Sequence, residues 1–488
     1  MKVFLKYMFW LLSFLMLTVY YLLSTQLGHK TMGYFLGEYL TKKTYNKIDV
    51  ESFDLSRYPN LVIDMKVNNE TKVQLMGKAN VHEVDMDYQL KGEKYRWNNF
   101  LIDSPIDVQG HIKGLASNLE VNGKGEVFDG NATYSFIKVP NEFKNMKIAL
   151  YDVESQKVLK FLKRRPLLRG RVNIISEFEI FSKYKKIGKS RVFMQKGFLP
   201  TFAPYVPFVL NSKIDFENVS YKFNGDIQSD IGNLVVNNAY YHKSQNIGGC
   251  DYDLKIKELS YFEEFLKGNY SGELNTEGKL EYKEKNFILE GVTDKFDGKL
   301  EYLYKDESLD LNLEGLSLVK IVQQFKYPSL LMAKVYGNVN YDLANKIILI
   351  NTKLKETQFR ETKMTNMISS ATGINMLTDV YDDSSFVAGY QNKRLTAILK
   401  IDNGVNHLYL NDTVLNSETN SIDSKFEIKM QNEELFGEIY GTLENPSVSI
   451  DVKRLIKYQV EKKLGSFFGN STKKKLKDEL NQLRGFLK

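Results

Sequence analysis

Apolar and polar residues alternate with a period of two along much of the chain, and this pattern limits the possible fold more than any other feature. It recurs in segments that turn residues separate: 84–90, 300–304, 309–313, 395–401, 426–430, 435–443 and 448–452. Such alternation is typical of strands with one apolar face and one solvated face. The short intervals favour antiparallel strands over parallel strands joined by helices. We therefore predict a mainly β fold, built as an elongated antiparallel meander.

A weak repeat interrupts the alternation. Short stretches with helical apolar spacing lie at 158–162, 259–266 and 318–325, each after a strand. Each stretch is followed by a glycine that precedes the next strand: Gly170, Gly272 and Gly337. The uneven spacing leaves two interpretations open. The short helices either plug the end of a sheet or mark the boundaries of modules.

The N-terminal segment predicts a membrane anchor. Lys2 and Lys6 precede an uncharged run at 7–28, which is 22 residues long. At about 1.5 Å per residue, this run could cross a hydrocarbon core of about 30 Å. No small-x-small cleavage motif follows, so we expect an uncleaved transmembrane signal anchor rather than a cleaved signal peptide. The two lysines predict a cytoplasmic tail at 1–6, with the rest of the chain across the membrane.

Cysteine content and net charge limit which cellular compartment and which classes of partner fit this sequence. Cys250 is the only cysteine, so the exported part has no internal disulfide. A large extracellular eukaryotic domain would often carry several disulfides, and a bacterial envelope fits at least as well. The formal net charge of +7 arises from 67 basic and 60 acidic residues. This mild balance does not indicate a nucleic-acid partner.

Motifs for catalysis or metal binding are missing from the sequence. The five histidines are scattered without ligand spacing: His29, His82, His111, His242 and His407. There is no nucleophile elbow or Walker loop, and the glycine-rich stretch at 123–130 predicts a hairpin turn rather than a phosphate loop. Asp85 and Asp87 alternate along a strand, which predicts a solvated face rather than an acid–base pair. We expect no enzyme activity, metal or cofactor.

One basic cluster lies in the first half of the chain. Lys163, Arg164, Arg165 and Arg169 flank Pro166–Leu168. Guanidinium groups suit phosphate head groups, so these residues are candidate contacts for a lipid head group or a partner. The simpler alternative is a solvated helix end, where cations complement the helix dipole.

The last segment, 451–488, changes from strand to helix periodicity. Its apolar residues fall on one helical stripe: Val452, Leu455, Ile456, Val460, Leu464 and Phe467. Lys453, Arg454 and Lys457 lie off this stripe and are candidate head-group or partner contacts, and a second basic helix is predicted at 473–488. Such a basic amphipathic tail either lies on anionic lipid, docks a partner or packs on its own sheet.

Both ends of the chain resemble proteins of the AsmA family. Near the C-terminus, a predicted strand ends before Asn403–Val405 and is followed by a polar meander. The run GTLENPSV at Gly441–Val448 comes next, and a lysine-rich helix follows it. At the N-terminus, the anchor is followed by a short helix at 34–43 and then by strands with Pro59 between them. The middle of the chain is similar in style to the related TamB proteins.

The resemblance covers about Met1–Val67 and Asn366–Leu464. It implies a single-pass bacterial inner-membrane protein whose bulk lies in the periplasm. The family is associated with outer-membrane homeostasis and with phospholipid movement between membranes, and its fold is a curled, taco-like antiparallel sheet with a hydrophobic groove. We accordingly expect a periplasmic β-groove region at 29–365, an AsmA-like C-terminal β region at 366–450 and the tail at 451–488.

Two functional hypotheses follow. In the first, the apolar face of an open, curled sheet holds phospholipid tails, since burial of each CH₂ contributes about 0.8 kcal/mol. The candidate lining residues are Val84, Met86, Tyr88, Leu90, Leu300, Tyr302, Leu309, Leu311, Leu313, Leu399, Ile401, Ile428, Ile439 and Leu443. A two-sheet sandwich would instead bury this face against another sheet. In the second hypothesis, a TamB-like structural or assembly factor tethers an outer-membrane protein or the outer-membrane inner leaflet through the tail, without conducting lipid.

Overall fold

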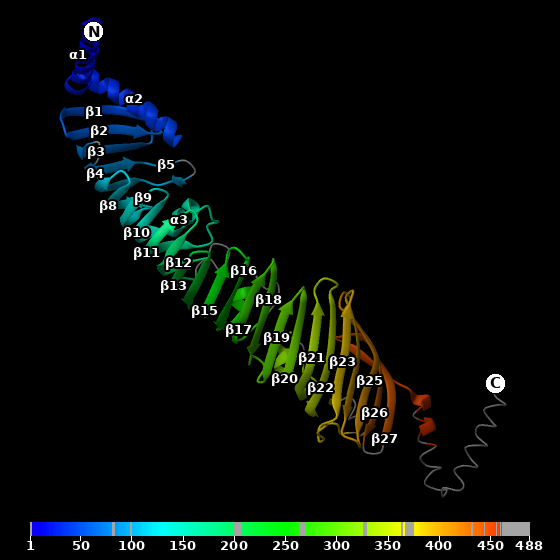
Figure 1. Ribbon diagram of the computed structural model, residues 1–488. Coiled ribbons are helices and arrows are strands. Elements are labelled where there is room, and N and C mark those ends of the chain that lie inside the picture. The colour runs from blue at the N-terminus through cyan, green and yellow to red at the C-terminus, as the bar shows by residue number, and fades with distance from the viewer. Residues whose placement is uncertain are drawn as a thin grey trace. The chain divides into compact units, whose positions relative to one another are not determined.

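The chain folds mainly as antiparallel β-structure, which confirms the prediction from the alternation (Figure 1). The computed structural model describes residues 2–80, 83–97, 100–199, 206–263, 270–325, 329–362, 365–366, 375–430, 433–443, 445–454, 456–458 and 460. Within them, 26 strands belong to antiparallel sheet, and β5 and β6 form a separate two-stranded hairpin. The chain divides into two compact units. The first comprises Met1–Leu266 with Glu281–Glu284, and the second comprises Lys267–Leu280 with Lys285–Lys488.

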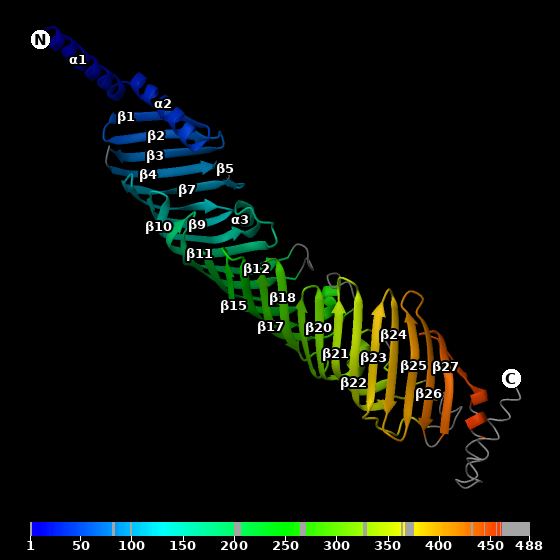
Figure 2. The ribbon, with the colours of Figure 1, turned by 45° about the vertical axis from the view of Figure 1, so that its right-hand side comes forward.

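The first unit is a meander in which strands that follow one another in the chain pair side by side, apart from the inserted hairpin (Figure 2). Its elements are α1 Lys2–Ser24, α2 Gln26–Thr44, β1 Ile48–Arg57, β2 Asn60–Val67, β3 Thr71–Ala79, β4 Glu83–Gly92, β5 Tyr95–Trp97, β6 Phe100–Ile102, β7 Ile106–Leu115, β8 Asn118–Val127, β9 Gly130–Val139, β10 Glu142–Glu154, α3 Ser155–Phe161, β11 Arg169–Ser182, β12 Lys186–Phe198, β13 Phe208–Glu217, β14 Ser220–Ser229, β15 Gly232–His242, β16 Ile247–Ile256 and the 3-10 helix η1 Leu259–Phe262.

The second unit repeats this design, with consecutive antiparallel pairs from β18 to β28. Its elements are β17 Leu274–Lys283, whose last residues belong to the first unit, β18 Asn286–Thr293, β19 Lys299–Lys305, β20 Ser308–Ser317, α5 Leu318–Gln324, β21 Leu331–Asp342, β22 Ile347–Phe359, β23 Ser384–Gln391, β24 Arg394–Asp402, β25 His407–Asn416, β26 Ser421–Met430, β27 Glu433–Thr442 and β28 Pro446–Ile450.

The strand register sorts apolar and polar side chains onto opposite faces of each unit. Residues paired across antiparallel strands point to the same face. One such row in the first unit is Leu90, Val108, Gly125, Ala132 and Leu150, and the adjacent row is Gln89, Gln109, Lys124, Thr133 and Ala149. The second unit has the row Tyr302, Leu311, Val339, Ile350 and Ala388 beside Glu301, Asn312, Asn338, Asn351 and Val387. Each unit therefore has an apolar face and a predominantly polar face.

Short helices cover parts of the apolar face, as one interpretation of the weak repeat predicts. Leu36 and Leu40 of α2 pack on a buried cluster of β1 and β2, and Val158 of α3 is buried in a cluster centred on β7 to β13. In the second unit, Leu318 and Ile321 of α5 pack on a cluster of β20 to β22. These helices act as local plugs on the face. A further cluster in the second unit, centred on β24 to β27, includes the fully buried side chains of Met376 and Tyr381 from the segment between β22 and β23.

The N-terminal helices differ from the predicted continuous span at 7–28. The first helix, α1, ends at Ser24, because Thr25 is extended and its hydroxyl accepts a hydrogen bond from Gly28 N at 3.0 Å, which caps α2. Within the described residues, no single helix is long and apolar enough to span a membrane. Only a pair of helical segments together has the length and apolar composition of a span: Trp10–Ser24 and Gln26–Thr44, which meet at a bend of 86°.

The glycine-rich stretch at 123–130 was predicted as a hairpin turn, and this prediction is wrong for its first residues. Gly123 and Gly125 lie inside β8, and the turn is formed by Phe128 and Asp129, both with positive φ. In the tail, residues 452–454, 456–458 and 460 are helical, as predicted. The predicted helix at 473–488, together with Leu455, Leu464 and Phe467, falls outside the described residues.

Candidate functional site

The apolar face holds nearly all the predicted lining residues. Val84, Met86, Tyr88 and Leu90 share one face of β4 in the first unit. In the second unit, cross-strand pairing places the following candidates on the apolar face of that unit: Leu300, Tyr302, Leu309, Leu311, Leu313, Leu399, Ile401, Ile428 and Ile439. Leu443 follows the end of β27 and is not part of a strand. Alternation alone was therefore sufficient to select residues that share a face within each unit.

Burial separates two groups among these candidates. Met86, Leu313, Ile401 and Ile428 are buried, and the last three belong to clusters of the protein's own side chains. The others are only half-buried: Val84, Tyr88, Leu90, Leu300, Tyr302, Leu309, Leu311, Leu399, Ile439 and Leu443. The buried group contributes to the packed core. In the half-buried group, Leu90, Leu300, Leu311, Leu399 and Ile439 also pack against these clusters, but each keeps part of its apolar surface exposed.

The opposite face is polar and its charges are largely paired. His111 lies between two carboxylates, with Nε2 3.0 Å from Asp85 Oδ1 and Nδ1 2.8 Å from Asp87 Oδ1. Lys91 Nζ lies 2.8 Å from Asp107 Oδ2, and this hydrogen bond lowers the pKa of the Asp107 carboxyl. Within the described residues, no group of three or more His, Cys, Asp or Glu side chains is placed to hold a metal ion. This face suits contact with water.

Two tyrosines lie across a glycine gap on the apolar face. The hydroxyl groups of Tyr88 on β4 and Tyr134 on β9 form a hydrogen bond of 2.5 Å. Gly110 on β7 and Gly123 on β8 pair with each other and lie between the two tyrosines in the same cross-strand row. A Cβ at Gly110 would lie 2.6 Å from Tyr88 Oη, and a Cβ at Gly123 would lie 2.7 Å from Tyr134 Cζ. Burial raises the pKa of the Tyr88 hydroxyl, so it stays protonated. Tyr134 is not among the residues predicted from the sequence.

A chain of aromatic rings continues from this pair along the first unit. Each ring centroid lies 5.0 to 6.5 Å from the next, and the series runs Tyr134, Phe136, Phe143, Phe181, Phe178, Phe216, Tyr221 and Tyr241. These residues come from β9, β10, β11, β13, β14 and β15. We call this series the aromatic ladder. No local sequence pattern indicates this ladder, because its contacts depend on the register of several strands.

The first predicted basic cluster lies in the loop between α3 and β11 and at the start of β11. Lys163, Arg164, Arg165 and Arg169 are all exposed, and their side chains form no ion pair with the described residues. By contrast, Lys160 on α3 lies 2.6 Å from a carboxylate oxygen of Asp103. The four loop and strand cations are thus free to meet an anion, which leaves both the head-group interpretation and the solvated-end interpretation open.

The second predicted basic cluster lies at the start of the tail in the second unit. The Arg454 guanidinium stacks 3.6 Å from the centre of the Phe436 ring, while Lys453 and Lys457 are exposed. The apolar residues of the helical stripe are also exposed: Val452 by 57%, Ile456 by 58% and Val460 by 49%. Of the three alternatives for the tail, packing of this stripe on the sheet is therefore not seen in the described residues.

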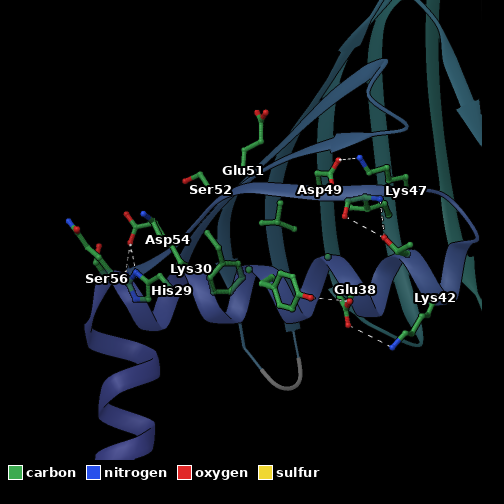
Figure 3. Close-up of a pocket in the computed structure, with 18 of the residues that line it drawn as sticks. His29, Lys30, Glu38, Lys42, Lys47, Asp49, Glu51, Ser52, Asp54 and Ser56 are labelled. Carbon is green, nitrogen blue, oxygen red and sulfur yellow. Dashed lines mark hydrogen bonds and ion pairs between the residues drawn. The ribbon is translucent and has the colours of Figure 1, made fainter.

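A cavity of about 870 Å³ lies between α2 and β1 (Figure 3). Its lining is mixed, with Lys42 and Glu38 on the helix and Lys47 and Asp49, 3.1 Å apart, on the strand side. At its α1 end, His29 is buried, and its Nε2 lies 2.9 Å from Leu23 O. The cavity is polar on much of its wall, so it suits structural packing of α2 more than storage of an acyl chain.

No family model, curated protein or solved structure matches this chain.

Proposed function

We propose that the chain is an inner-membrane-anchored periplasmic protein that holds phospholipid tails on its apolar face and transfers phospholipid between the inner and outer membranes. The observation that carries the proposal is the half-buried apolar face, which continues in register from strand to strand within each unit. Within the described residues, the only strands outside the main sheet are β5 and β6. This hairpin packs Tyr95 and Ile102 on the cluster of β7 to β13, so it covers part of the face there, and no larger second sheet is present among the described strands.

The energetics of an apolar face that is only partly covered support a lipid ligand. Soluble proteins rarely expose contiguous apolar patches larger than a few hundred Å², and larger patches mark sites of interaction. Each acyl CH₂ that leaves water for such a surface contributes about 0.8 kcal/mol. A chain of 16 carbons, taken as a general example, thus supplies on the order of 10 kcal/mol before ordering costs. The head group remains in water at the edge of the face.

Irregularities in the strand pairs support a curled sheet with the apolar face inside. Register shifts occur between Leu150 and Val153, between Phe178 and Ile180, and at further points in β14 and β15. Such bulges bend a strand and increase its twist. We infer that the curl reduces the exposure of the apolar side chains without covering them, in the manner of a groove.

The apolar surface of α1 supports membrane attachment. Trp10 is 65% exposed, Leu11 70% and Phe14 71%, so apolar side chains project in several directions around this helix. A helix that is apolar all round is stable when protein or lipid surrounds it. In the proposal, lipid does so, residues 1–6 stay in the cytoplasm and the two units lie in the periplasm.

Charge substitutions on one face, with matched substitutions on the other, test the proposal. Leu90→Asp and Ile148→Asp place a carboxylate on half-buried positions of the apolar face, and Gln89→Asp and Lys147→Asp place it on the polar face of the same strands. We expect the first pair to lose most of the phospholipid that copurifies with the full chain, measured by mass spectrometry. The second pair should retain it, and circular dichroism should show that all four variants are folded. Equal lipid content in both pairs would contradict the proposal.

A second candidate function, a tether without lipid conduction, is favoured by the exposed stripe of Val452, Ile456 and Val460. In this case, removal of 451–488 should abolish capture of an outer-membrane partner, and the apolar-face variants should be fully active. Full activity of the truncated chain would exclude the tether.

A further inference from the structure

Four residues form a row across neighbouring strands at the turn end of the apolar face in the first unit. Lys138 of β9 pairs with Phe143 of β10, Phe143 pairs with Phe181 of β11, and Phe181 pairs with Lys186 of β12. Because paired residues share a face, both lysines lie on the same side of the sheet as the aromatic ladder. We call these residues the Lys–Phe–Phe–Lys row.

Each lysine of the row is placed over a phenylalanine ring. Lys138 Nζ lies 5.0 Å from the centre of the Phe143 ring, and Lys186 Nζ lies 5.1 Å from the centre of the Phe181 ring. The two rings are 6.5 Å apart. Such cation–π contacts hold an ammonium group at the border of an apolar surface and leave its other hydrogens free to donate. Lys138 also donates to Val139 O at 2.5 Å.

The charges of the adjacent turns leave this region positive. The acids of the β9–β10 and β13–β14 turns are already paired, Glu142 with Lys144 at 3.5 Å and Glu217 with Lys222 at 2.7 Å. The remaining lysines of the row and of the β11–β12 and β15–β16 turns form no ion pair with the described residues: Lys138, Lys183, Lys185, Lys186 and Lys243. An anion that reaches this end of the face therefore meets several uncompensated cations and no free carboxylate from these turns.

We propose that the Lys–Phe–Phe–Lys row binds the phosphate of an anionic phospholipid whose acyl chains lie on the aromatic ladder. This inference rests on the proposed function and adds the class of lipid. Lys138 and Lys186 are separated by three strand spacings, about 14 Å at about 4.8 Å each. Their ammonium groups lie over the intervening rings, so a head group placed above Phe143 and Phe181 has a cation on either side. A zwitterionic head group carries its own ammonium, which the two lysines repel.

The test measures binding of fluorescent phosphatidylglycerol and phosphatidylethanolamine to the full chain in detergent micelles. We expect the unaltered chain to prefer phosphatidylglycerol. Lys138→Gln with Lys186→Gln should lower this preference about tenfold, which corresponds to about 1.4 kcal/mol. Lys138→Arg with Lys186→Arg should keep most of it. The matched control is Lys147→Gln with Lys196→Gln, which removes two exposed cations from the opposite face of β10 and β12 and should change nothing.

The outcomes separate this inference from the proposed function. If the glutamine variant binds lipid and keeps the preference for phosphatidylglycerol, the row is not the head-group site and the inference is overturned. If glycerophosphoglycerol or inorganic phosphate binds as tightly as the lipid, the site takes a free phosphate and the inference also fails. If the unaltered chain binds neither lipid, the proposed function falls and the inference falls with it.

Discussion

The hydroxyl groups of Tyr88 and Tyr134 lie 2.5 Å apart although 46 positions separate the two residues in the chain. Two strands, β7 and β8, lie between their own strands, and the contact is possible because Gly110 and Gly123 present no side chain beneath the two rings. The pair thus connects four strands of the first unit at the apolar face. It also places two polar groups on that face without leaving either one unpaired.

The glycine gap gives the first prediction. Gly123→Ala introduces a Cβ 2.7 Å from Tyr134 Cζ, so we expect a destabilisation of about 1–3 kcal/mol from overpacking. The measurement is the unfolding midpoint of the full chain in urea. Gly389→Ala in β23 is the control, because its new Cβ would have no neighbour closer than 3.7 Å. An equal effect of both substitutions would show that the tyrosine pair does not depend on the gap.

A second prediction concerns Asp103, which follows β6. Hydrogen bonds from Lys160 and Lys94 lower the pKa of its carboxyl from 3.8 to about 2. A carboxyl whose pKa is lower in the folded chain stabilises the fold above its unfolded pKa, and this contribution is lost as the pH falls through the folded value. The window is therefore between about pH 4 and about pH 2.

The measurement compares thermal unfolding of the unaltered chain and Asp103→Asn at pH 6 and below pH 2. We expect the variant to unfold at a lower temperature at pH 6 and at the same temperature as the unaltered chain below pH 2. The effect should be small, because the Asp103 side chain is partly exposed to solvent and ion pairs near the surface are screened. A difference that persists unchanged at low pH would rule out the two ion pairs as its source.

How much of this structure follows from the sequence depends on the distance over which each feature is determined. Alternation from Val84 to Leu90 was sufficient to place the candidates of β4 on one face, because the period of a strand is a local property. The contact between Tyr88 and Tyr134 depends on the register of four strands, and no local pattern specifies that register. The helix break at Thr25 was missed for another reason. Ser24, Thr25 and Gln26 are uncharged, so the uncharged run continues through them, although the Thr25 hydroxyl caps a new helix there.

A third prediction concerns the packing of α2 on β1. A Cβ at Gly37 would lie 3.1 Å from Ile48 O, so the helix backbone lies close to the edge of the first strand. Gly37→Leu should push α2 away from β1 and expose its unpaired edge. We expect faster hydrogen exchange at the β1 amides, measured by mass spectrometry. Tyr39→Leu, at a position that is 58% exposed, should leave exchange unchanged. Slow exchange in both variants would show that the close approach is unnecessary.

The central claim, that phospholipid lies on one face of the sheet, is tested most directly by photo-crosslinking along a single strand. A photoreactive amino acid is placed in turn at each position from Val84 to Leu90 of the full chain in cells, and bound phospholipid is detected by mass spectrometry. We predict crosslinks at Val84, Tyr88 and Leu90 and none at the intervening Asp85, Asp87 and Gln89. Crosslinks on both faces alike, or on neither, would contradict the account.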